Sequence, residues 1–147
     1  MTEENKKVGT GFGVMLVRNG QVLLGKRHTD PDKADSVFRA ADVWTMPGGK
    51  FEWGETFKEG AARELLEETG IILKKSKVIC VNCDKNEFAH FVTVGFLAEE
   101  FNGEAKVMEP DEITEWQWFS FDNLPKNIYF PSIKVLECYK ENKFTVE

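Results

Sequence analysis

The sequence predicts an α/β protein in which helices pack on a mixed β-sheet. Three observations support this fold class. Asn19-Gly20 separates two apolar runs, which is the strongest short-range indication of a β-hairpin. Residues 56–70 have the capping and apolar pattern of an amphipathic helix, and runs rich in Val, Ile and Phe follow it. The length of 147 residues suits one domain, so we predict a single domain over residues 1–147.

The first elements are a predicted hairpin and a long connection. Strands are expected over residues 11–17 (GFGVMLV) and 21–27 (QVLLGKR), on either side of Asn19-Gly20. Both residues of this dipeptide adopt positive φ readily, as the tight hairpin turn requires. Residues 28–42 form a polar and mixed connection. A connection this long in a compact domain is often functional.

A helix is predicted to begin after Thr56. Thr56 and Glu59 form a possible capping box, in which each side chain hydrogen-bonds the backbone of the other. Gly70 lies where a left-handed C-terminal cap belongs. The expected helix is therefore about 14 residues, or roughly 20 Å, long. Its apolar stripe consists of Phe57, Ala61, Leu65 and Leu66.

The remaining elements are three strands and a closing helix. Strands are expected over residues 71–83, 89–101 and 112–121, because these runs are enriched in β-branched and aromatic residues. The last helix is expected over residues 131–142, with Pro131 near its first position, where proline is favoured. Together with the hairpin, these elements complete the predicted sheet and its packed helices.

The composition excludes several functional classes. The formal net charge of −6 provides no general attraction for nucleic acid or an anionic membrane surface. No apolar run approaches the roughly 20 residues of a membrane span, and the N-terminal residues lack an apolar signal core. Three cysteines make a poor disulfide framework, so we expect a reduced, cytoplasmic setting. A polyphosphate ligand would need local cations or a metal.

The segment RELLEETG, residues 63–70, carries an unusual concentration of negative charge. On a helix, Glu64, Glu67 and Glu68 share one face, and like charges at this spacing cost a few tenths of a kcal/mol per pair. Carboxylate oxygens converging on one patch suit hard divalent cations such as Mg²⁺ or Mn²⁺. The alternative is an ordinary solvated face, which is the commoner explanation of a charge run.

The acidic helix belongs to a longer ordered pattern. The pattern runs Gly49, five residues, Glu55, seven residues, Arg63-Glu64-Leu65, one residue, Glu67-Glu68, one residue, Gly70-Ile71. It resembles the signature of the Nudix hydrolase family at every specified position. The flanking segments VLLGKR, MPGGKFEWGE and EWQWFSFDNLP are similar to the MutT-like nucleoside triphosphate diphosphatases of that family.

The resemblance implies a Nudix-type α/β/α sandwich with a central mixed sheet, and hydrolysis of a nucleoside diphosphate linked to a group X. It implies that Glu64, Glu67 and Glu68 are metal ligands, with the Gly49 carbonyl as a further one. It also implies an ion pair between Glu55 and Arg63 that steadies the loop and helix, although Arg63 could instead only screen the acidic patch. The expected cofactor is Mg²⁺, with Mn²⁺ as a substitute.

The expected substrate is a small-molecule nucleotide, most simply a nucleoside triphosphate cleaved to a monophosphate and pyrophosphate. Nucleotide sugars, ADP-ribose and dinucleoside polyphosphates are the rival substrates. A nucleotide-sensing domain without turnover is the rival from another functional class. The sequence indicates neither nucleic-acid nor membrane partners, and it leaves both a monomer and a homodimer open.

A general base is expected from the segment MEPDEITEW. Hydrolysis needs a carboxylate that accepts the proton of the attacking water. In the family this role belongs either to a motif glutamate or to a glutamate on a later loop. Glu109 and Glu112 precede a predicted strand, and we favour Glu112 over Glu109. The alternative is that both are loop residues exposed to solvent.

Substrate contacts are expected from residues outside the signature. Lys26 and Arg27, at the end of a predicted strand, could bind terminal phosphates, although a polar strand end is an equal alternative. Phe130 could stack on a base, but an apolar anchor for the last helix is the commoner role. Thr45 and Met46 are candidates for the pocket floor by position.

A zinc site is not favoured, because Cys80 and Cys83 form a single CxxC pair in a chain that has only two histidines. His90 is more simply a partly buried strand residue than a substrate ligand.

Overall fold

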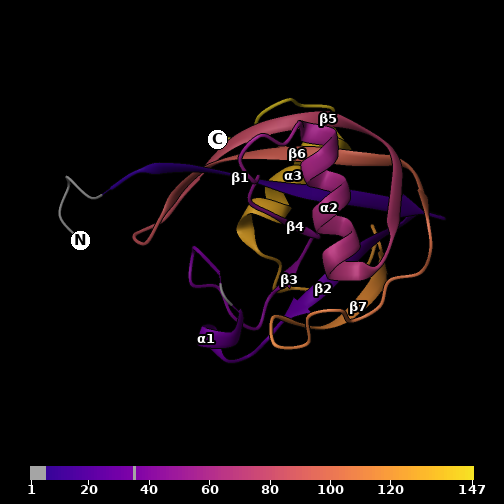
Figure 1. Cartoon of the computed structure of the whole chain (residues 1–147), viewed down its shortest axis with the longest axis horizontal. Helices are drawn as coiled ribbons and strands as arrows, with labels where there is room; N and C mark the ends of the chain where they lie inside the picture. The colour runs from indigo at the N-terminus through magenta and orange to yellow at the C-terminus, as the bar shows by residue number, and fades with distance from the viewer. Residues whose placement is uncertain (1–5, 35) are drawn as a thin grey trace.

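The computed structural model describes residues 6–34 and 36–147 of the chain. Figure 1 shows a sheet with α2 in front of it and α3 behind it. The strands are β1 (Val8–Arg18), β2 (Gln21–Arg27), β3 (Trp44–Thr45), β4 (Gly48–Gly49), β5 (Ile72–Lys85), β6 (His90–Asn102) and β7 (Ile113–Ser120), and the helices are α1 (Pro31–Ala34), α2 (Phe57–Thr69) and α3 (Phe130–Glu141). This arrangement confirms the predicted α/β/α sandwich around a mixed sheet.

The sheet is mixed because β1 and β6 are parallel while the other pairings are antiparallel. The strand order is β3-β2-β1-β6-β5, with β4 paired to β1 and β7 paired to β2. β1 pairs with β2 only at Val17 and Arg18, beside the turn. Further along, β1 pairs with β4 at Phe12 and Gly13 instead. The two strands of the hairpin therefore separate, and β4 enters on the side that β2 leaves (Figure 1).

The hairpin turn has the predicted geometry. Asn19 and Gly20 have φ values of 53° and 74°, and both lie in the left-handed region that Asn-Gly supplies at low cost. β2 continues from this turn and pairs along its whole length with β7. The turn therefore fixes the start of a ribbon that includes residues of the C-terminal half of the chain.

The predicted caps of α2 are both present. The Thr56 side chain accepts a hydrogen bond from the Glu59 N–H at 3.2 Å, and the Glu59 carboxylate accepts one from the Thr56 N–H at 3.1 Å. Gly70 ends the helix with φ of 78°, and its N–H donates to the Leu66 carbonyl at 3.0 Å. The acidic segment is therefore a helix whose two ends are both defined by capping hydrogen bonds.

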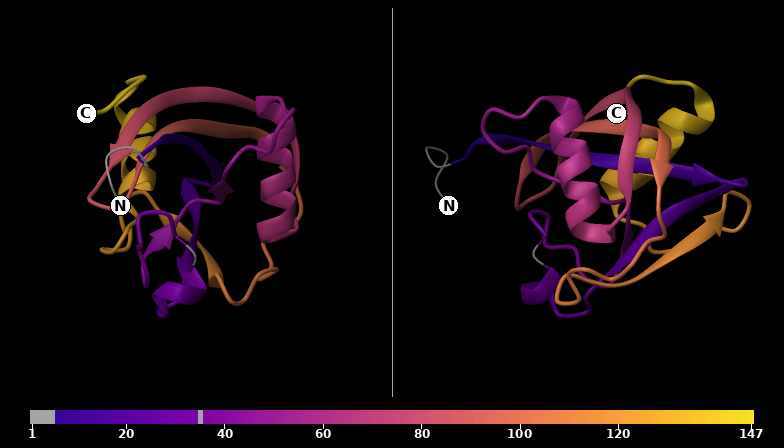
Figure 2. Two further views of the ribbon diagram at one scale, coloured as in Figure 1. Left: turned by 60° about the vertical axis from the view of Figure 1, so that its left-hand side comes forward. Right: turned by 45° about the vertical axis from the view of Figure 1, so that its right-hand side comes forward.

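Two apolar clusters cover the two faces of the sheet. The α2 cluster contains Phe12, Val14, Leu16, Leu23, Ala61, Leu65, Ile71, Val94, Phe96 and Ala98. The α3 cluster contains Met15, Val22, Leu24, Met46, Cys80, Val135, Leu136 and Cys138. Figure 2 shows the two helices on opposite sides of the strands. α3 is held by burial of Val135, Leu136 and Cys138 against one face. Of the stripe predicted for α2, only Ala61 and Leu65 are buried against the other face, whereas Phe57 and Leu66 are 55% and 51% exposed.

Several local features differ from the sequence-based expectations. The connection over residues 28–42 contains the short helix α1 and reaches the two-residue strand β3. Gly48 and Gly49 lie outside the strands expected from the sequence, but they pair with β1 and neither has positive φ. Glycine is needed there for close approach, because a Cβ at Gly48 would overlap the Phe12 carbonyl oxygen.

The predicted single domain over residues 1–147 stays a prediction. Residues 1–5 and Asp35 lie outside the part that the structure describes. Within the described ranges, no helix is both long enough and apolar enough to cross a bilayer.

Candidate functional site

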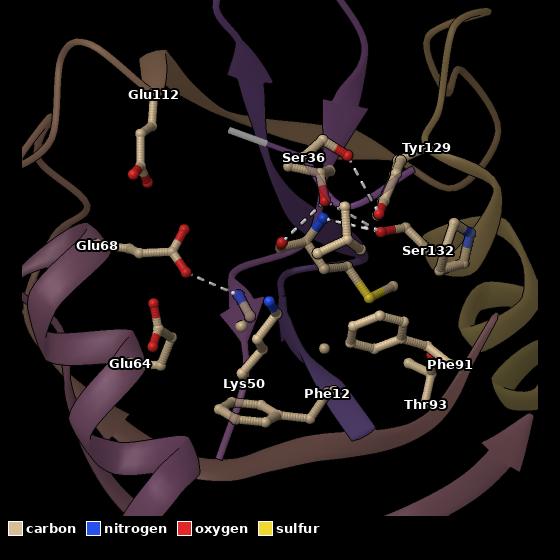
Figure 3. Close-up of a pocket in the computed structure, with 18 of the residues that line it drawn as sticks. Phe12, Ser36, Lys50, Glu64, Glu68, Phe91, Thr93, Glu112, Tyr129 and Ser132 are labelled. Atoms are coloured by element: carbon tan, nitrogen blue, oxygen red, sulfur yellow. Dashed lines mark hydrogen bonds between the residues drawn. The ribbon is translucent and has the colours of Figure 1, made fainter. Parts of the chain in front are cut away.

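One cavity of about 490 Å³ lies where β1, β4, β6, α2 and α3 meet. Gly11, Phe12 and Gly13 of β1 contribute part of its lining. The cavity also receives residues from the 28–42 connection and from the segment between β6 and β7. Figure 3 shows carboxylates along one side of this cavity and aromatic and hydroxyl groups on the other. The two sides offer different chemistry to a single ligand.

The acidic side is formed by α2. Glu68 is only 6% exposed, and its carboxylate accepts a hydrogen bond from the Gly48 N–H at 3.0 Å. The Glu64 carboxyl group lies against Gly49, where an added Cβ would come within 2.7 Å of its carboxyl carbon. The side chain of Glu67 is 50% exposed and also lines the cavity. The glycine pair and the glutamates are therefore two halves of one packed unit.

Arg63 joins this unit to the preceding turn. Its Nε and Nη2 donate to the two oxygens of Glu55 at 2.6 and 3.0 Å, and Nη2 also donates to the Lys50 carbonyl at 3.0 Å. Its Nη1 donates to Glu64 at 2.8 Å and to Glu67 at 3.3 Å. The ion pair between Glu55 and Arg63 matches the geometry that the resemblance implied, and the same guanidinium also screens the acidic patch.

The pKa values of these carboxyl groups diverge. Hydrogen bonds from Arg63 and the Glu52 N–H lower the pKa of Glu55. Burial raises the pKa of Glu64, against the opposing effect of Arg63. Burial and the nearby Glu64 charge raise the pKa of Glu68 well above its ordinary value. The Glu55 carboxylate is therefore stabilised in its charged form, whereas burial disfavours the charged forms of Glu64 and Glu68, in spite of the contact between Arg63 and Glu64.

Glu109 and Glu112 extend the acidic side from the segment before β7. Both line the cavity, and Figure 3 shows the Glu112 carboxylate across from that of Glu68. Burial and the charges of Glu64 and Glu67 raise the pKa of Glu109. The structure thus brings both candidates of the later loop to the same side as the signature glutamates.

The acidic side fits a divalent cation by its donor chemistry. Its carboxylates are hard oxygen donors, and burial raises the pKa values of Glu64, Glu68 and Glu109, so that a bound cation would favour their charged forms. Across residues 6–34 and 36–147, no three acidic, histidine or cysteine side chains converge into a ready-made metal cage. Mg²⁺ commonly binds through one or two carboxylates and completes its coordination with water and substrate phosphates. The residues present therefore fit Mg²⁺ as a cation shared with a substrate.

The opposite side of the cavity is aromatic and rich in hydroxyl groups. Phe91 and Thr93 of β6 and Tyr129 and Ser132 at the start of α3 line it (Figure 3). The Ser132 hydroxyl accepts a hydrogen bond from the Met46 N–H at 3.1 Å, which ties α3 to the segment after β3. Rings and hydroxyl groups suit a nucleoside, whose base is flat and apolar on its faces and polar at its edges.

Two cationic side chains lie between these sides. The Arg27 guanidinium is 4.7 Å from the centroid of the Tyr129 ring and donates to the Ala34 carbonyl at 3.0 Å. Its charge also moderates the pKa of Glu68, so it lies within electrostatic reach of the acidic side. The Lys50 ammonium is 5.6 Å from the centroid of the Phe91 ring and points into the cavity in Figure 3. Both cations are placed to meet phosphate oxygens.

The structure separates the predicted substrate contacts into two groups. Arg27, Thr45 and Met46 line the cavity. Lys26 does not line it, and instead pairs with Asp42 at 3.1 Å. Phe130 also lies outside the lining, with its ring packed 4.9 Å from that of Phe38, in keeping with the role of an apolar anchor.

Sequence reasoning missed Lys50, Phe91, Thr93, Tyr129 and Ser132 as lining residues. Lys50 follows the glycine pair directly, which is a usable indication. The other four are ordinary strand and helix residues, and only the packing of β6 against α3 brings them together.

The cysteines show no preformed zinc or disulfide site. Cys80 is buried beneath α3 and Cys83 is exposed, and both are free thiols. Burial and the neighbouring Cys138 raise the pKa of Cys80 to about 12, which disfavours the thiolate needed for metal binding or redox chemistry.

The sequence is similar to proteins of a known family. A family profile described as NUDIX domain matches residues 7–138. The chain is 31% identical over 127 residues to an ADP-ribose pyrophosphatase of Methanocaldococcus jannaschii, which covers 85% of this chain and 69% of that protein. It is 36% identical over 112 residues to the NAD-capped RNA hydrolase NudC of Haemophilus influenzae, which covers 74% of this chain but 38% of that longer protein.

A solved structure shows the same arrangement over most of the chain. The crystal structure of a MutT NUDIX hydrolase from Burkholderia pseudomallei superposes with a TM-score of 0.79 at 34% identity. The match covers 90% of this chain and 98% of that one.

Proposed function

The chain belongs to the Nudix family of pyrophosphohydrolases, and on this premise we propose that it cleaves nucleoside triphosphates to a monophosphate and pyrophosphate. The family membership and the enzyme class agree with what the sequence predicted. The choice of substrate within the class is the proposal. It rests on the similarity to a MutT NUDIX hydrolase over 90% of this chain and 98% of that one, together with flanking segments that resemble the MutT-like nucleoside triphosphate diphosphatases. The single cavity with an acidic side and an aromatic, hydroxyl-bearing side suits any nucleoside diphosphate derivative.

The two sides of the cavity suggest how a nucleotide binds. We place the nucleoside against Phe91 and Tyr129, where flat rings can contact it. The diphosphate then extends towards Glu64 and Glu68 and passes Arg27. An arginine fork binds phosphate oxygens by charge-assisted hydrogen bonds, which fix both position and orientation.

We propose that Glu64, Glu67 and Glu68 hold Mg²⁺, with the Gly49 carbonyl as a further ligand and Mn²⁺ as a substitute. When bound, the cation neutralises the diphosphate and lowers the pKa of a coordinated water. The chain itself holds the glutamates in place, because Gly48 donates to Glu68 and Arg63 restrains Glu64. The raised pKa values of Glu64 and Glu68 support this assignment, since both carboxylates gain from added positive charge.

A carboxylate must also accept the proton of the attacking water. We propose Glu112 for this role, because its carboxylate faces the acidic side from the segment opposite α2 (Figure 3). Glu109 is the alternative, and its raised pKa brings it nearer to the operating pH of a general base.

ADP-ribose is the second candidate substrate. The similarity to an archaeal protein named ADP-ribose pyrophosphatase favours it, and its adenosine diphosphate would occupy the same two sides of the cavity. The same cavity could bind nucleotides without turnover, as a sensing domain would. The intact set of cavity-lining glutamates argues against that alternative, since binding alone does not need all of them.

The test is a substrate panel ranked by kcat/KM, because specificity is a difference in transition-state binding. The panel contains the nucleoside triphosphates, ADP-ribose, nucleotide sugars and dinucleoside polyphosphates, each with Mg²⁺ and with a chelator. We expect pyrophosphate release from at least one triphosphate, and loss of this release with the chelator or with Glu67→Gln. A higher kcat/KM for ADP-ribose would transfer the assignment to the second candidate. Nucleotide binding without any product would favour the sensor.

A further inference from the structure

Thr93 carries a buried hydroxyl group to which the fold gives no partner. Its side of the cavity lies opposite Glu64 and Glu68 (Figure 3), and the residue is only 7% exposed. In the part of the chain that the structure describes, no group forms a hydrogen bond with this hydroxyl. Side-chain hydroxyl groups that are buried to this extent nearly always have a partner. A partnerless one that lines a cavity therefore points to a ligand.

The two other buried hydroxyl groups of the cavity are already engaged. The Thr45 hydroxyl donates to the Met46 carbonyl at 3.1 Å, and the Ser132 hydroxyl accepts from the Met46 N–H at 3.1 Å. The Thr45 and Ser132 oxygens also lie 3.4 Å apart, within reach of a hydrogen bond. The backbone of Met46 therefore sets the direction of these two groups, whereas the Thr93 hydroxyl can turn to suit a ligand.

Thr93 is the innermost side chain that β6 contributes to the cavity. Alternate residues of a strand share a face, so Phe91, Thr93 and Gly95 point to the same side of the sheet. A Cβ at Gly95 would overlap the Cys80 sulfur and lie 3.1 Å from two Val135 carbons. β6 is therefore covered directly by α3 at Gly95, and the cavity ends at Thr93.

The polar residue that pairs with Thr93 across the strands is directed elsewhere. Asn82 of β5 is opposite Thr93 in the register, but it is 1% exposed and does not line the cavity. Its Oδ1 accepts from the Val146 N–H at 2.7 Å, and its Nδ2 lies 3.8 and 3.9 Å from the sulfur atoms of Cys80 and Cys138. Asn82 therefore does not compete with a ligand for the Thr93 hydroxyl.

The proposed binding mode brings one edge of the base to Thr93. The base lies against Phe91, two residues from Thr93 on the same face of β6, and the diphosphate extends towards the glutamates. The edge of the base that is furthest from its sugar then points inward. This edge carries the amino or oxo substituent at position 6 of a purine or position 4 of a pyrimidine.

We propose that Thr93 recognises this substituent, by accepting a hydrogen bond from an amino group or donating one to an oxo group. The inference rests on the proposed function, because the placement of the nucleoside determines which part of the ligand reaches Thr93. A hydroxyl both donates and accepts, and its proton rotates to suit the partner. Since no described residue fixes the direction of this hydrogen bond, the site selects for the presence of a polar substituent and not for its polarity.

The test compares nucleotides that differ at this substituent. ATP carries an amino group, ITP an oxo group, and purine riboside 5′-triphosphate only hydrogen. CTP, UTP and the triphosphate of pyrimidin-2-one riboside form the matching pyrimidine series. The value of kcat/KM with Mg²⁺ is measured for the wild type, for Thr93→Val, which removes the hydroxyl at nearly constant shape, and for Thr93→Ser, which keeps it.

Thr10→Val is the matched control, because Thr10 is exposed on the neighbouring strand β1 and does not line the cavity. Calorimetric titration with the α,β-methylene analogues of the same nucleotides, in the presence of Mg²⁺, provides a readout of binding that does not depend on turnover.

In the series that is hydrolysed faster, we expect the wild type to prefer the amino and oxo members over the unsubstituted one. The preference should be about 2- to 12-fold, which is the contribution of one hydrogen bond, and the amino and oxo members should differ by less than that. Thr93→Val should abolish the preference by lowering kcat/KM for the substituted members alone. Thr93→Ser and Thr10→Val should retain it.

An undiminished preference in Thr93→Val, an equal loss for all members of a series, or a wild type without preference would each overturn the inference while leaving the proposed hydrolysis intact. A difference between the amino and oxo members that exceeds the preference itself would also overturn it. A preference in analogue binding that depends on Thr93, without hydrolysis of any triphosphate, would preserve the recognition of the base and overturn the proposed function. Absence of binding by every analogue would overturn both.

Discussion

Gly49→Ala is the sharpest test of how the glycine pair supports the acidic site. A Cβ at this position would lie 2.7 Å from the Glu64 carboxyl carbon and 2.8 and 3.0 Å from its two oxygens. Non-bonded carbon atoms pack at about 3.5–4.0 Å, so the carboxyl group has to withdraw by about 1 Å. A displacement of about 1 Å at a reacting centre costs on the order of 10²-fold in rate. We therefore expect kcat/KM to fall by about that factor.

The fold should tolerate Gly49→Ala. The displaced atoms are the end of a flexible side chain, and Gly49 does not have positive φ. The added methyl also restricts the unfolded chain, which contributes about 0.4–1 kcal/mol in favour of folding where the backbone is compatible. The melting temperature should consequently stay near that of the wild type, while more Mg²⁺ is needed for half-maximal activity.

Gly48→Ala is the matched control, because the same methyl group, placed one residue earlier in the chain, contacts backbone atoms of β1 instead of a side chain. Its Cβ would overlap the Phe12 carbonyl oxygen, which belongs to β1 and cannot rotate away. Overpacking of this kind costs about 1–3 kcal/mol or more. The melting temperature should fall by about 2–4 °C for each kcal/mol in a domain of this size.

Thermal denaturation and pyrophosphate release with Mg²⁺, measured on both variants, separate the two effects. Full activity of Gly49→Ala would refute the packing argument, and so would a loss of stability equal to that of Gly48→Ala.

Three further predictions follow from the carboxyl groups. Glu68 has a raised folded-state pKa, so the metal-free protein should lose stability as pH rises from the ordinary glutamate pKa through this raised value; melting curves with a chelator should show a smaller loss in Glu68→Gln, where only Glu64 and Glu109 keep raised pKa values, and Mg²⁺ should stabilise the wild type more than this variant. Glu55 has a lowered pKa, so its stabilising contribution is present above the ordinary glutamate pKa and is lost as pH falls through the lowered pKa. The difference in melting temperature between wild type and Glu55→Gln should therefore be largest near neutral pH and vanish in acid. A difference that stays constant with pH would contradict the ion-pair argument. Glu112→Gln should lower kcat by about 10²–10⁴-fold if Glu112 is the general base, whereas Glu109→Gln should have the smaller effect; turnover within a few-fold of wild type for both would remove the later segment from the mechanism.

The strongly local features of the fold could be predicted from the sequence. Asn19-Gly20, the Thr56–Glu59 capping box and Gly70 each specify a backbone conformation within a few residues, and each has the predicted geometry. The pairing of Gly48 and Gly49 with β1 was not predictable in this way. It depends on β2 leaving β1 after Val17 and Arg18, and that separation is determined by the long pairing of β2 with β7.

The candidate site divides along the same line. The spacing of the glutamates on one helix was sufficient to predict that they share a face. The opposite side of the cavity was not predictable, because Phe91 and Tyr129 come from elements distant in sequence and from ordinary strand and helix positions. The prediction that Lys26 contacts the substrate together with Arg27 ignored the alternation of strand side chains, since adjacent strand residues point to opposite sides of a sheet. Only Arg27 of the predicted pair faces the cavity.

The structure also explains how the acidic helix tolerates its own repulsion. The nitrogens of Arg63 have separate partners: Nε and Nη2 hold Glu55 and the Lys50 carbonyl, whereas Nη1 contacts Glu64 and Glu67. A cation that binds Glu64 and Glu67 can replace the Nη1 contacts without disturbing the other two nitrogens. Arg63 can thus compensate the glutamates before a cation arrives and still brace the turn afterwards. A lysine at this position would provide the charge, but it could not hold separate partners through separate nitrogens, because an ammonium is a single point charge.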